Sequence, residues 1–358
     1  MAKILALVTD AFGGGYGIAQ YNRDFLAALS SANAQVIVHT RQAPLTEKPP
    51  HGIEQRPPKQ GRFSYSCSAL LEAFRMKPDI VFCGHLYMAP LGWLAAKIAN
   101  AKFVIQTHGI EAWSRPSRLR CWSCEKASMI FSVSRHTRGR VLDWASIQPE
   151  RAVVVPNTVD DCFTPGDEST LIREWQLENK KILLTVGRMS TSERYKGHDR
   201  VIETLSALGK AGHDLVYVIA GGGDDRSRLE RLAKDLGVKD RVRFVGILTR
   251  DQLIETYRIA DLFVMPSTGE GFGIAFLEAM ACGTLALGIN AAGSRDALAD
   301  GELGILADGN DLTRAISDAL SQQKRDPAEL HRAVQLRFGR DLFQARIAAI
   351  LSELIKAA

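Results

Sequence analysis

The segment 266–286 combines residue types that suit a phosphorylated, hydroxyl-rich ligand. Glu270 and Glu278 have seven residues between them, and glycine occupies every second position from 269 to 273. The carboxylates can accept hydrogen bonds from sugar and ribose hydroxyls, and the glycines let a ligand approach the backbone. A helix predicted to begin near Ile274 offers unpaired amides and a positive dipole end to an anion. The pattern therefore predicts a sugar-nucleotide site with its diphosphate at the helix start.

The same segment also fits a simpler interpretation. Glycine-rich turns between strands and helices are common in α/β proteins, and a glutamate in a first helical turn is ordinary capping. Spacing alone leaves the ligand site and the plain turn equally open.

A pair of cations follows the first predicted strand of the second half of the chain. Arg188 lies just beyond the strand Ile182–Val186, and Lys196 follows a short loop and precedes a helix. Arginine binds phosphate through a bidentate fork, whereas lysine acts as a point charge. Either residue alone would be interpreted as a solvated surface cation. Together at the carboxyl end of a strand, they are predicted to neutralise a departing diphosphate without a metal ion.

Other predicted strand ends carry weaker signals. Gly221 and Gly222 follow the strand Leu215–Ala220 and would let a base or a phosphate approach, although a tight turn explains them nearly as well. His108 follows another buried strand and is a candidate for hydrogen bonding to a transferred sugar or for proton transfer. His85 is a weaker candidate of the same kind.

The glycine-rich segment 11–17 raises the alternative of a dinucleotide-dependent oxidoreductase. The GxGxxG fingerprint that would include Gly15 requires glycine where Ile18 stands, and the next predicted strand does not end at an acid for the ribose. We therefore interpret Gly14 and Gly15 as part of a lid or backbone cradle at the carboxyl end of a strand, where open α/β sheets bind ligands.

The bulk properties indicate a two-domain globular protein. The chain has 358 residues, of which 46% are hydrophobic and 24% charged, and no apolar run approaches the roughly 20 residues of a membrane span. The N-terminal run resembles a first strand and not a signal peptide, so we expect a cytoplasmic protein. Six cysteines do not form a disulfide framework, and the CxxC pair Cys121 and Cys124 lacks a partner motif for zinc. We expect no metal site.

Alternating strand and helix patterns predict an α/β protein with two parallel sheets flanked by helices. We predict a long loop over 43–62, a linker over 161–180, an N-terminal domain over 1–164 and a C-terminal domain over 165–340, with a ligand cleft between the two halves. The predicted strands are Lys3–Thr9, Val36–His39, Asp79–Cys83, Lys102–Gln106, Met129–Val133, Val153–Val155, Ile182–Val186, Leu215–Ala220, Val242–Val245, Leu262–Met265 and Thr284–Leu287.

Over nearly its whole length, the chain resembles glycosyltransferase family 4. The resemblance rests on the order of Gly187-Arg188, Lys196-Gly197, the glycine loop after residue 220 and the two glutamates at 270 and 278. Gly14-Gly15, His108-Gly109 and the segment 155–160 agree with it. It implies a GT-B fold, in which two Rossmann-like domains face each other across a cleft. It also implies a terminal helix, here 341–358, that crosses back onto the N-terminal domain.

The resemblance implies a role for each motif. Arg188 and Lys196 would bind the donor diphosphate, Glu278 the ribose, and His108 the sugar. Glu270 would hold the donor sugar and phosphate together with the backbone amides of Gly271, Phe272 and Gly273, with the first domain reading the acceptor. It further implies a UDP- or GDP-sugar donor, no cofactor, no metal, and retention of anomeric configuration through reaction on the front face of the donor.

The charge distribution suggests the nature of the acceptor. Residues 1–165 carry a formal charge of +7 and the remainder −2. A basic surface with interleaved aromatics suits an anionic membrane bearing a lipid-linked glycan, although a solvated basic face explains it equally well. No nucleic-acid reader module is recognisable. The residues concerned are Arg115, Arg118 and Arg120 between Trp113 and Trp122, and Lys59 and Arg62 near Phe63 and Tyr65.

We therefore expect a retaining hexosyltransferase that acts on a glycan or lipid-linked acceptor, by analogy in cell-surface polysaccharide assembly and at the inner face of the membrane. A sugar-nucleotide epimerase of the same fold would need no acceptor. A phosphorylase would need a cofactor such as pyridoxal phosphate, for which no lysine motif is evident. A non-catalytic binding subunit would tolerate losses at Arg188, Lys196, Glu270 and Glu278, all of which are intact.

Overall fold

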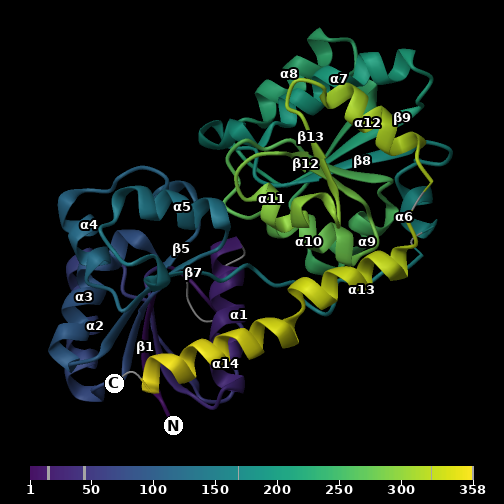
Figure 1. Cartoon of the computed structure of the whole chain (residues 1–358). Coiled ribbons are helices and arrows are strands. Elements are labelled where there is room, and N and C mark those ends of the chain that lie inside the picture. Colours follow the sequence, from purple (N-terminus) through teal and green to yellow (C-terminus); the bar gives the residue numbers. More distant parts are fainter. Residues whose placement is uncertain (14–16, 43–45, 168, 324, 357–358) are drawn as a thin grey trace. The chain divides into compact units, whose positions relative to one another are not determined.

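The computed structural model describes residues 1–13, 17–42, 46–167, 169–323 and 325–356. These residues form two compact units, each with a parallel sheet covered by helices (Figure 1). Unit 1 comprises residues 1–158 and 340–358, and unit 2 comprises residues 159–339. The prediction of two parallel sheets flanked by helices is confirmed.

The described part of unit 1 contains a sheet of seven parallel strands in the order β3-β2-β1-β4-β5-β6-β7. Its central strands are short apolar runs that are buried along their whole length, as expected for parallel strands covered on both faces. The strands are β1 Lys3–Val8, β2 Gln35–Thr40, β3 Ile53–Arg56, β4 Ile80–Cys83, β5 Lys102–Thr107, β6 Met129–Ser132 and β7 Ala152–Val154.

Helices connect the strands of unit 1. They are α1 Gly17–Ser31, α2 Arg62–Met76, α3 Ala89–Ala99, α4 Arg118–Glu125 and α5 Arg135–Trp144, with short 3-10 turns η1 Leu86–Met88, η2 Ile110–Ala112 and η3 Pro149–Arg151.

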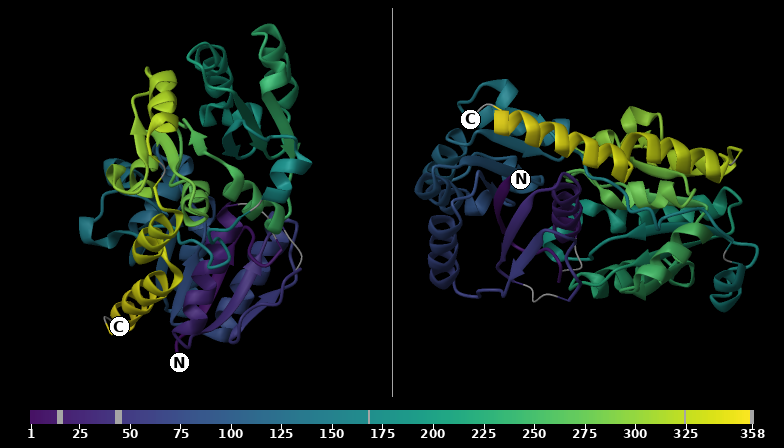
Figure 2. Two further views of the ribbon diagram at one scale, coloured as in Figure 1. Left: turned by 90° about the vertical axis from the view of Figure 1, so that its right-hand side faces the viewer. Right: turned by 90° about the horizontal axis from the view of Figure 1, so that it is seen from below.

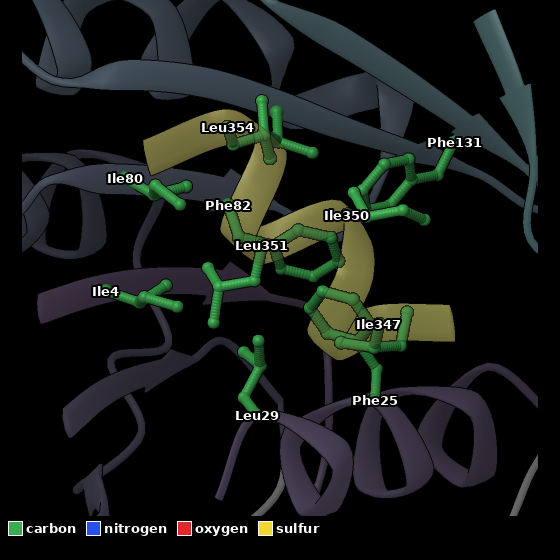
Figure 3. Close-up of a pocket in the computed structure, with 11 residues that line it drawn as sticks. Ile4, Phe25, Leu29, Ile80, Phe82, Phe131, Ile347, Ile350, Leu351 and Leu354 are labelled. Atoms are coloured by element: carbon green, nitrogen blue, oxygen red, sulfur yellow. The ribbon is translucent and has the colours of Figure 1, made fainter. Parts of the chain in front are cut away.

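The C-terminal helix α14, Arg340–Lys356, packs beside α1 in unit 1 (Figure 2). Its buried side chains recur every three or four residues and so form one helical stripe. Figure 3 shows Ile347 and Leu351 of this stripe facing Phe25 and Phe82 across an apolar pocket. The lining side chains are all hydrocarbon, so this pocket offers no polar side chain to a sugar nucleotide.

The described part of unit 2 contains a sheet of six parallel strands in the order β10-β9-β8-β11-β12-β13. Strands β8 and β11, which are far apart in the sequence, pair at the centre, with Leu183 opposite Leu262. The strands are β8 Lys181–Val186, β9 Leu215–Ala220, β10 Val242–Gly246, β11 Leu262–Met265, β12 Ala286–Ile289 and β13 Ile305–Ala307.

The helices of unit 2 flank this sheet, and α13 packs against α10. They are α6 Ser169–Glu174, α7 His198–Lys210, α8 Arg226–Asp235, α9 Arg250–Ile259, α10 Ile274–Ala281, α11 Ser294–Ala297, α12 Leu312–Ser321 and α13 Pro327–Phe338, with 3-10 turns η4 Thr191–Lys196, η5 Lys239–Arg241 and η6 Ala299–Gly301.

Apart from shifts of one residue at strand ends, four elements differ from the sequence predictions. Strand β3 lies inside the predicted loop 43–62, helix α6 lies inside the predicted linker 161–180, and β13 was not predicted. Strand β12 begins two residues later than expected. Both β3 and β13 are edge strands that pair with a single neighbour. Because β3 is mostly polar, its strand character comes from that pairing more than from a local apolar pattern, whereas β13 is an apolar run of only three residues.

Candidate functional site

In unit 2, the loops that carry the sequence motifs follow β8 and β11, the two strands between which the strand order reverses. The chain runs from β8 outward to β10 on one side and returns through β11 to β13 on the other. Ligands of open parallel sheets bind beyond the carboxyl ends of the strands at such a switch point. Arg188 follows β8 and Glu270 follows β11, so both lie at this end of the paired strands.

A cluster of four charged side chains occupies the switch point. The Lys196 Nζ atom lies 3.5 Å from Glu270 Oε1 and 3.8 Å from Glu193 Oε2. Glu193 also forms an ion pair with Arg188 through its other oxygen. The side chains of the two glutamates and the lysine are only 13–17% exposed, whereas that of Arg188 is 54% exposed. The structure thus brings together three residues predicted from the sequence and adds Glu193.

Sequence reasoning assigned no role to Glu193. Its spacing of three residues from Lys196 was a usable signal, because residues three apart on a helical turn are neighbours. Its pairing with Arg188 depends on the turn η4, where Glu193 itself has non-helical dihedral angles of φ −121° and ψ 27°. That kink is a property of the folded loop and is not visible in the residue pattern.

The glycine loop after β9 supports the loop that carries Arg188. A Cβ atom on Gly221 would lie 2.1 Å from the Gly187 carbonyl oxygen, and Gly221 has φ +139°. Next to it, the Met189 amide donates to the Gly222 carbonyl oxygen over 2.8 Å. These glycines therefore permit close backbone packing, which positions Arg188 whether or not a ligand is bound.

The loop after β11 is held against the loop that carries Lys196. The Thr268 amide donates to the Tyr195 carbonyl oxygen over 3.0 Å, and a Cβ atom on Gly269 would lie 2.7 Å from the Tyr195 ring. A Cβ atom on Gly197 would likewise lie 2.9 Å from the Pro266 side chain. Close packing of these two loops places Lys196 beside Glu270.

The start of helix α10 presents amides to this site. Gly273 caps the helix in the left-handed region at φ +98°. Within the described residues, the amides of Gly271, Phe272 and Gly273 donate no hydrogen bond. The Phe272 side chain is buried against Phe338, with ring centroids 5.7 Å apart, so only its backbone is available to a ligand. The arrangement can accept an anion at the helix start.

Glu278 lies in the second turn of α10 and is oriented by a buried phenol. The Tyr257 hydroxyl donates to Glu278 Oε2 over 2.8 Å. Burial raises the pKa of Tyr257 well above its usual range, so the hydroxyl remains a donor. Tyr257 lies on α9, and no sequence pattern linked it to Glu278.

In unit 1, His108 follows β5 and bonds to the loop after β4. Its Nε2 atom lies 2.9 Å from the Gly84 carbonyl oxygen. Because a carbonyl oxygen only accepts, Nε2 carries the proton and Nδ1 of the neutral ring is an acceptor. Burial lowers the pKa of His108, although Glu111 and the Gly84 carbonyl oppose the shift. The ring is therefore neutral at pH 7 and can accept a hydrogen bond from a hydroxyl.

His85 lies near His108 in unit 1, with the two ring centroids 6.1 Å apart. Burial lowers the pKa of His85 to about 4. His85 is therefore also neutral at pH 7. The other predicted site residues of unit 1, Gly14 and Gly15, lie outside the described residues.

The basic and aromatic residues of unit 1 divide into exposed and buried sets. Phe63 and Trp122 are exposed, and the Arg120 guanidinium lies 4.7 Å from the centroid of the Tyr87 ring. The expectation that Tyr65 belongs to this surface is wrong, because its side chain is buried and its hydroxyl donates to the His39 carbonyl oxygen over 3.0 Å.

Two kinds of feature are absent from the described residues. They contain no group of three or more His, Cys, Asp or Glu side chains placed to hold a metal ion. They also contain no helix that is both long and apolar enough to cross a membrane.

Two family models match the chain in adjacent stretches. The model described as Glycosyltransferase Family 4 matches residues 15–162, and the model described as Glycosyl transferases group 1 matches residues 167–335. The chain belongs to glycosyltransferase family 4. The four clustered charges of unit 2 and the amides at the start of α10 all lie in the second match, whereas His108 lies in the first.

Two relatives of this family 4 protein are named as sugar transferases. The GDP-mannose-dependent alpha-(1-6)-phosphatidylinositol monomannoside mannosyltransferase of Mycolicibacterium smegmatis is 31% identical over 261 residues, which are 67% of this chain and 66% of the relative. The D-inositol 3-phosphate glycosyltransferase of Geodermatophilus obscurus is 30% identical over 275 residues, which are 69% of this chain and 60% of the relative. The chain thus spans just under two thirds of these relatives.

Solved structures confirm the predicted GT-B fold of the family 4 chain. The Anabaena protein HepE in complex with UDP-glucose superimposes with a TM-score of 0.81 and covers 99% of this chain and 100% of its own. The two sequences are 19% identical, so this likeness concerns the fold.

Proposed function

We propose that this protein transfers a hexose from a nucleoside-diphosphate sugar to a glycan or lipid-linked acceptor. The observation that carries the proposal is the pairing of Lys196 with Glu270 beside the unbonded amides at the start of α10. Two relatives named as sugar transferases, one of them GDP-mannose-dependent, support it. In this proposal residues 165–340 bind the donor, residues 1–164 bind the acceptor, and helix 341–358 belongs with the acceptor-binding part.

Each charged group has a role in donor binding. Arg188 and Lys196 contact the diphosphate, and the amides of residues 271–273 bind its oxygens at the positive end of α10. Glu278, held by Tyr257, accepts hydrogen bonds from the ribose hydroxyls. Glu270 accepts hydrogen bonds from the donor sugar. Gly221 and Gly222 contribute by positioning Arg188.

Departure of the nucleoside diphosphate requires stabilisation of the charge that develops on its phosphate oxygens. The cations and amides of unit 2 are held in place before the ligand binds, so little reorganisation is needed during reaction. Two fixed cations provide positive charge from the protein itself, which is the basis for proposing that the reaction is metal-independent. Equal initial rates with and without a chelator are expected, and loss of activity that added magnesium restores would contradict this part of the proposal.

We propose that the product retains the anomeric configuration of the donor. The acceptor hydroxyl attacks the anomeric carbon on the face from which the diphosphate leaves, and a phosphate oxygen receives its proton. Neutral His108 then accepts a hydrogen bond from a sugar hydroxyl through Nδ1 and takes no part in the proton transfer. Proton NMR of the first product formed tests this, because an inverted anomer would contradict the proposal.

The donor is proposed to be a UDP- or GDP-sugar. Melting curves of the purified protein with UDP, GDP, ADP, dTDP and NAD distinguish the candidates, since a ligand that binds only the folded state raises the apparent stability. A rise in melting temperature with UDP or GDP is expected. A rise with NAD alone would overturn the transferase proposal.

The acceptor is proposed to lie at the inner face of a membrane, with the protein cytoplasmic and peripherally bound, in polysaccharide assembly. Support comes from exposed apolar side chains beside cations on unit 1, where Phe63 is 84% and Leu119 60% exposed. Such a surface suits anionic lipid headgroups. Flotation with anionic vesicles at low salt is expected to carry the protein upward, and F63S/L119S is expected to weaken this. Absence of flotation at low salt would refute the membrane proposal.

A further inference from the structure

The carboxylate of Glu193 lies between the two cations that are proposed to bind the donor diphosphate. One of its oxygens forms the ion pair with Arg188, and the other lies 3.8 Å from Lys196 Nζ. A phosphate group placed between these two cations would occupy the same space. Glu193 therefore holds the position of an anionic ligand.

We propose that Glu193 is an internal competitor of the donor diphosphate, which it leaves on binding and reoccupies on release. This inference rests on the proposed function of the same site. Two carboxylates and two cations balance in charge before the ligand arrives. A diphosphate added without any displacement would face two carboxylates at short range, and like charges so placed repel strongly when partly buried. Withdrawal of Glu193 removes one of them.

The surrounding backbone is anchored, so the moving part is the Glu193 side chain. Before it, the Thr191 amide donates to Asp224 Oδ1 over 3.0 Å. After it, the Gly197 amide donates to the Arg194 carbonyl oxygen over 3.0 Å. A change of rotamer would free both cations without moving the loop that carries Lys196.

The bonding of Glu193 differs from that of a structural carboxylate nearby. Asp225 is bound by two arginines, with Arg194 NH2 at 2.9 Å and Arg228 NH2 at 2.6 Å from its oxygens. By contrast, Glu193 Oε2 is buried and has no hydrogen-bond partner among the described residues. An unsatisfied buried oxygen costs free energy, which lowers the cost of moving Glu193 away.

Neutralising Glu193 should therefore strengthen binding of diphosphates. In isothermal titration with inorganic pyrophosphate and with UDP and GDP, we expect E193Q to bind about 10-fold more tightly than the unchanged protein, which corresponds to about 1.4 kcal/mol. E203Q, which changes an exposed glutamate of α7 in the same unit, is the matched control and should bind as the unchanged protein does.

A second measurement ties the effect to the cations. In K196A the gain from E193Q should shrink by several-fold, because the competitor has lost one of its two partners, and a double-mutant cycle measures this coupling. Far-ultraviolet circular dichroism and melting curves establish that each variant is folded.

The outcomes separate this inference from the proposed function. Tighter binding by E193Q, reduced in the K196A background, supports the competitor role. Equal or weaker binding by folded E193Q, while the unchanged protein binds, overturns the inference alone and makes Glu193 a residue that positions Arg188. Failure of both proteins to bind pyrophosphate or either nucleotide overturns the donor-site assignment and the inference with it.

Discussion

Both sheets are parallel, but paired charges gather at the switch point of unit 2 whereas neutral histidines lie near that of unit 1. In unit 2 the loops after β8 and β11 bring together Arg188, Glu193, Lys196 and Glu270. In unit 1 the sheet reverses between β1 and β4, and the Gly84 carbonyl there bonds to His108. Burial keeps the histidines near this point neutral at pH 7.

In both units the parallel sheet determines where a ligand site can lie, and the loops after the strands determine which chemical groups that site contains. The charged groups of unit 2, of which Lys196 and the two glutamates are largely buried, are paired with one another, so they can bind a multiply charged ligand by exchanging partners. Neutral imidazoles in unit 1 can accept or donate hydrogen bonds without attracting or repelling charge. In the proposed reaction, unit 2 therefore stabilises the leaving group, and unit 1 recognises hydroxyls.

The largest expected effect comes from removing a cation of unit 2. K196A should lower kcat/KM for transfer about 100- to 1,000-fold, the range seen when one preorganised transition-state donor is removed. Initial rates with saturating acceptor measure this. K234A, which removes an exposed lysine of α8, is the matched control and should keep full activity. If both variants lost the same activity, or if neither lost any, the proposed role of Lys196 in stabilising the leaving group would be contradicted.

The next effect tests whether the glycine loop positions Arg188. G221A places a Cβ atom 2.1 Å from the Gly187 carbonyl oxygen at φ +139° and should destabilise the protein by about 2–4 kcal/mol while weakening nucleotide binding. G212A is the control, because its φ is +90° but no atom lies within 4 Å of the added Cβ. Its cost should be near 1 kcal/mol. Urea unfolding curves compare the two, and equal costs would contradict the positioning role.

Lowering the pH should destabilise unit 1 more than unit 2. Among the described residues, burial lowers the pKa of His39, His85 and His108 in unit 1 and of His198 in unit 2. These rings stay neutral in the folded state, while unfolded histidine gains a proton near pH 6.5. The unfolded state thus binds more protons as the pH falls from about 6.5 toward 4, and stability is lost in that window.

Unit 1, with three such histidines, should lose more stability than unit 2 in this window. Hydrogen exchange of the β1 and β8 amides at pH 7.0 and 5.5, corrected for intrinsic rates, measures the difference. A larger loss of protection in β8 would contradict the expected order.

The smallest effect concerns the orientation of Glu278. Y257F removes the hydrogen bond to its Oε2 atom and should weaken nucleotide binding by about 5- to 10-fold, which corresponds to about 1–1.4 kcal/mol, the net worth of one ordinary hydrogen bond. Y217F is the matched control, since its buried hydroxyl bonds to Thr185 over 2.7 Å and away from Glu278. Titration calorimetry should show unchanged nucleotide affinity for Y217F, and equal weakening would indicate a general packing effect.

Local patterns in the sequence were sufficient for most of the fold. The apolar run Leu262–Met265 and the start of α10 at Ile274 match the structure, because each depends on residues adjacent in the chain. Strand β3 escaped prediction because its mostly polar residues become a strand by pairing with β2. Strand β13 is apolar but only three residues long, too short for a local pattern to mark it. Helix α6 was missed because proline and acidic residues around it suggested a linker.

By itself, the sequence determined which residues could do chemistry and in what order they occur. The hydrophobic runs that a parallel sheet must bury predict where the strands end, and Arg188, Glu270 and His108 come just after such ends. Only the tertiary structure decided that β8 lies beside β11, which brings Lys196 to Glu270, 74 residues further along the chain. It also placed Glu193 against both Arg188 and Lys196. Such contacts depend on strand pairing and on backbone packing between loops, for which local sequence carries no signal.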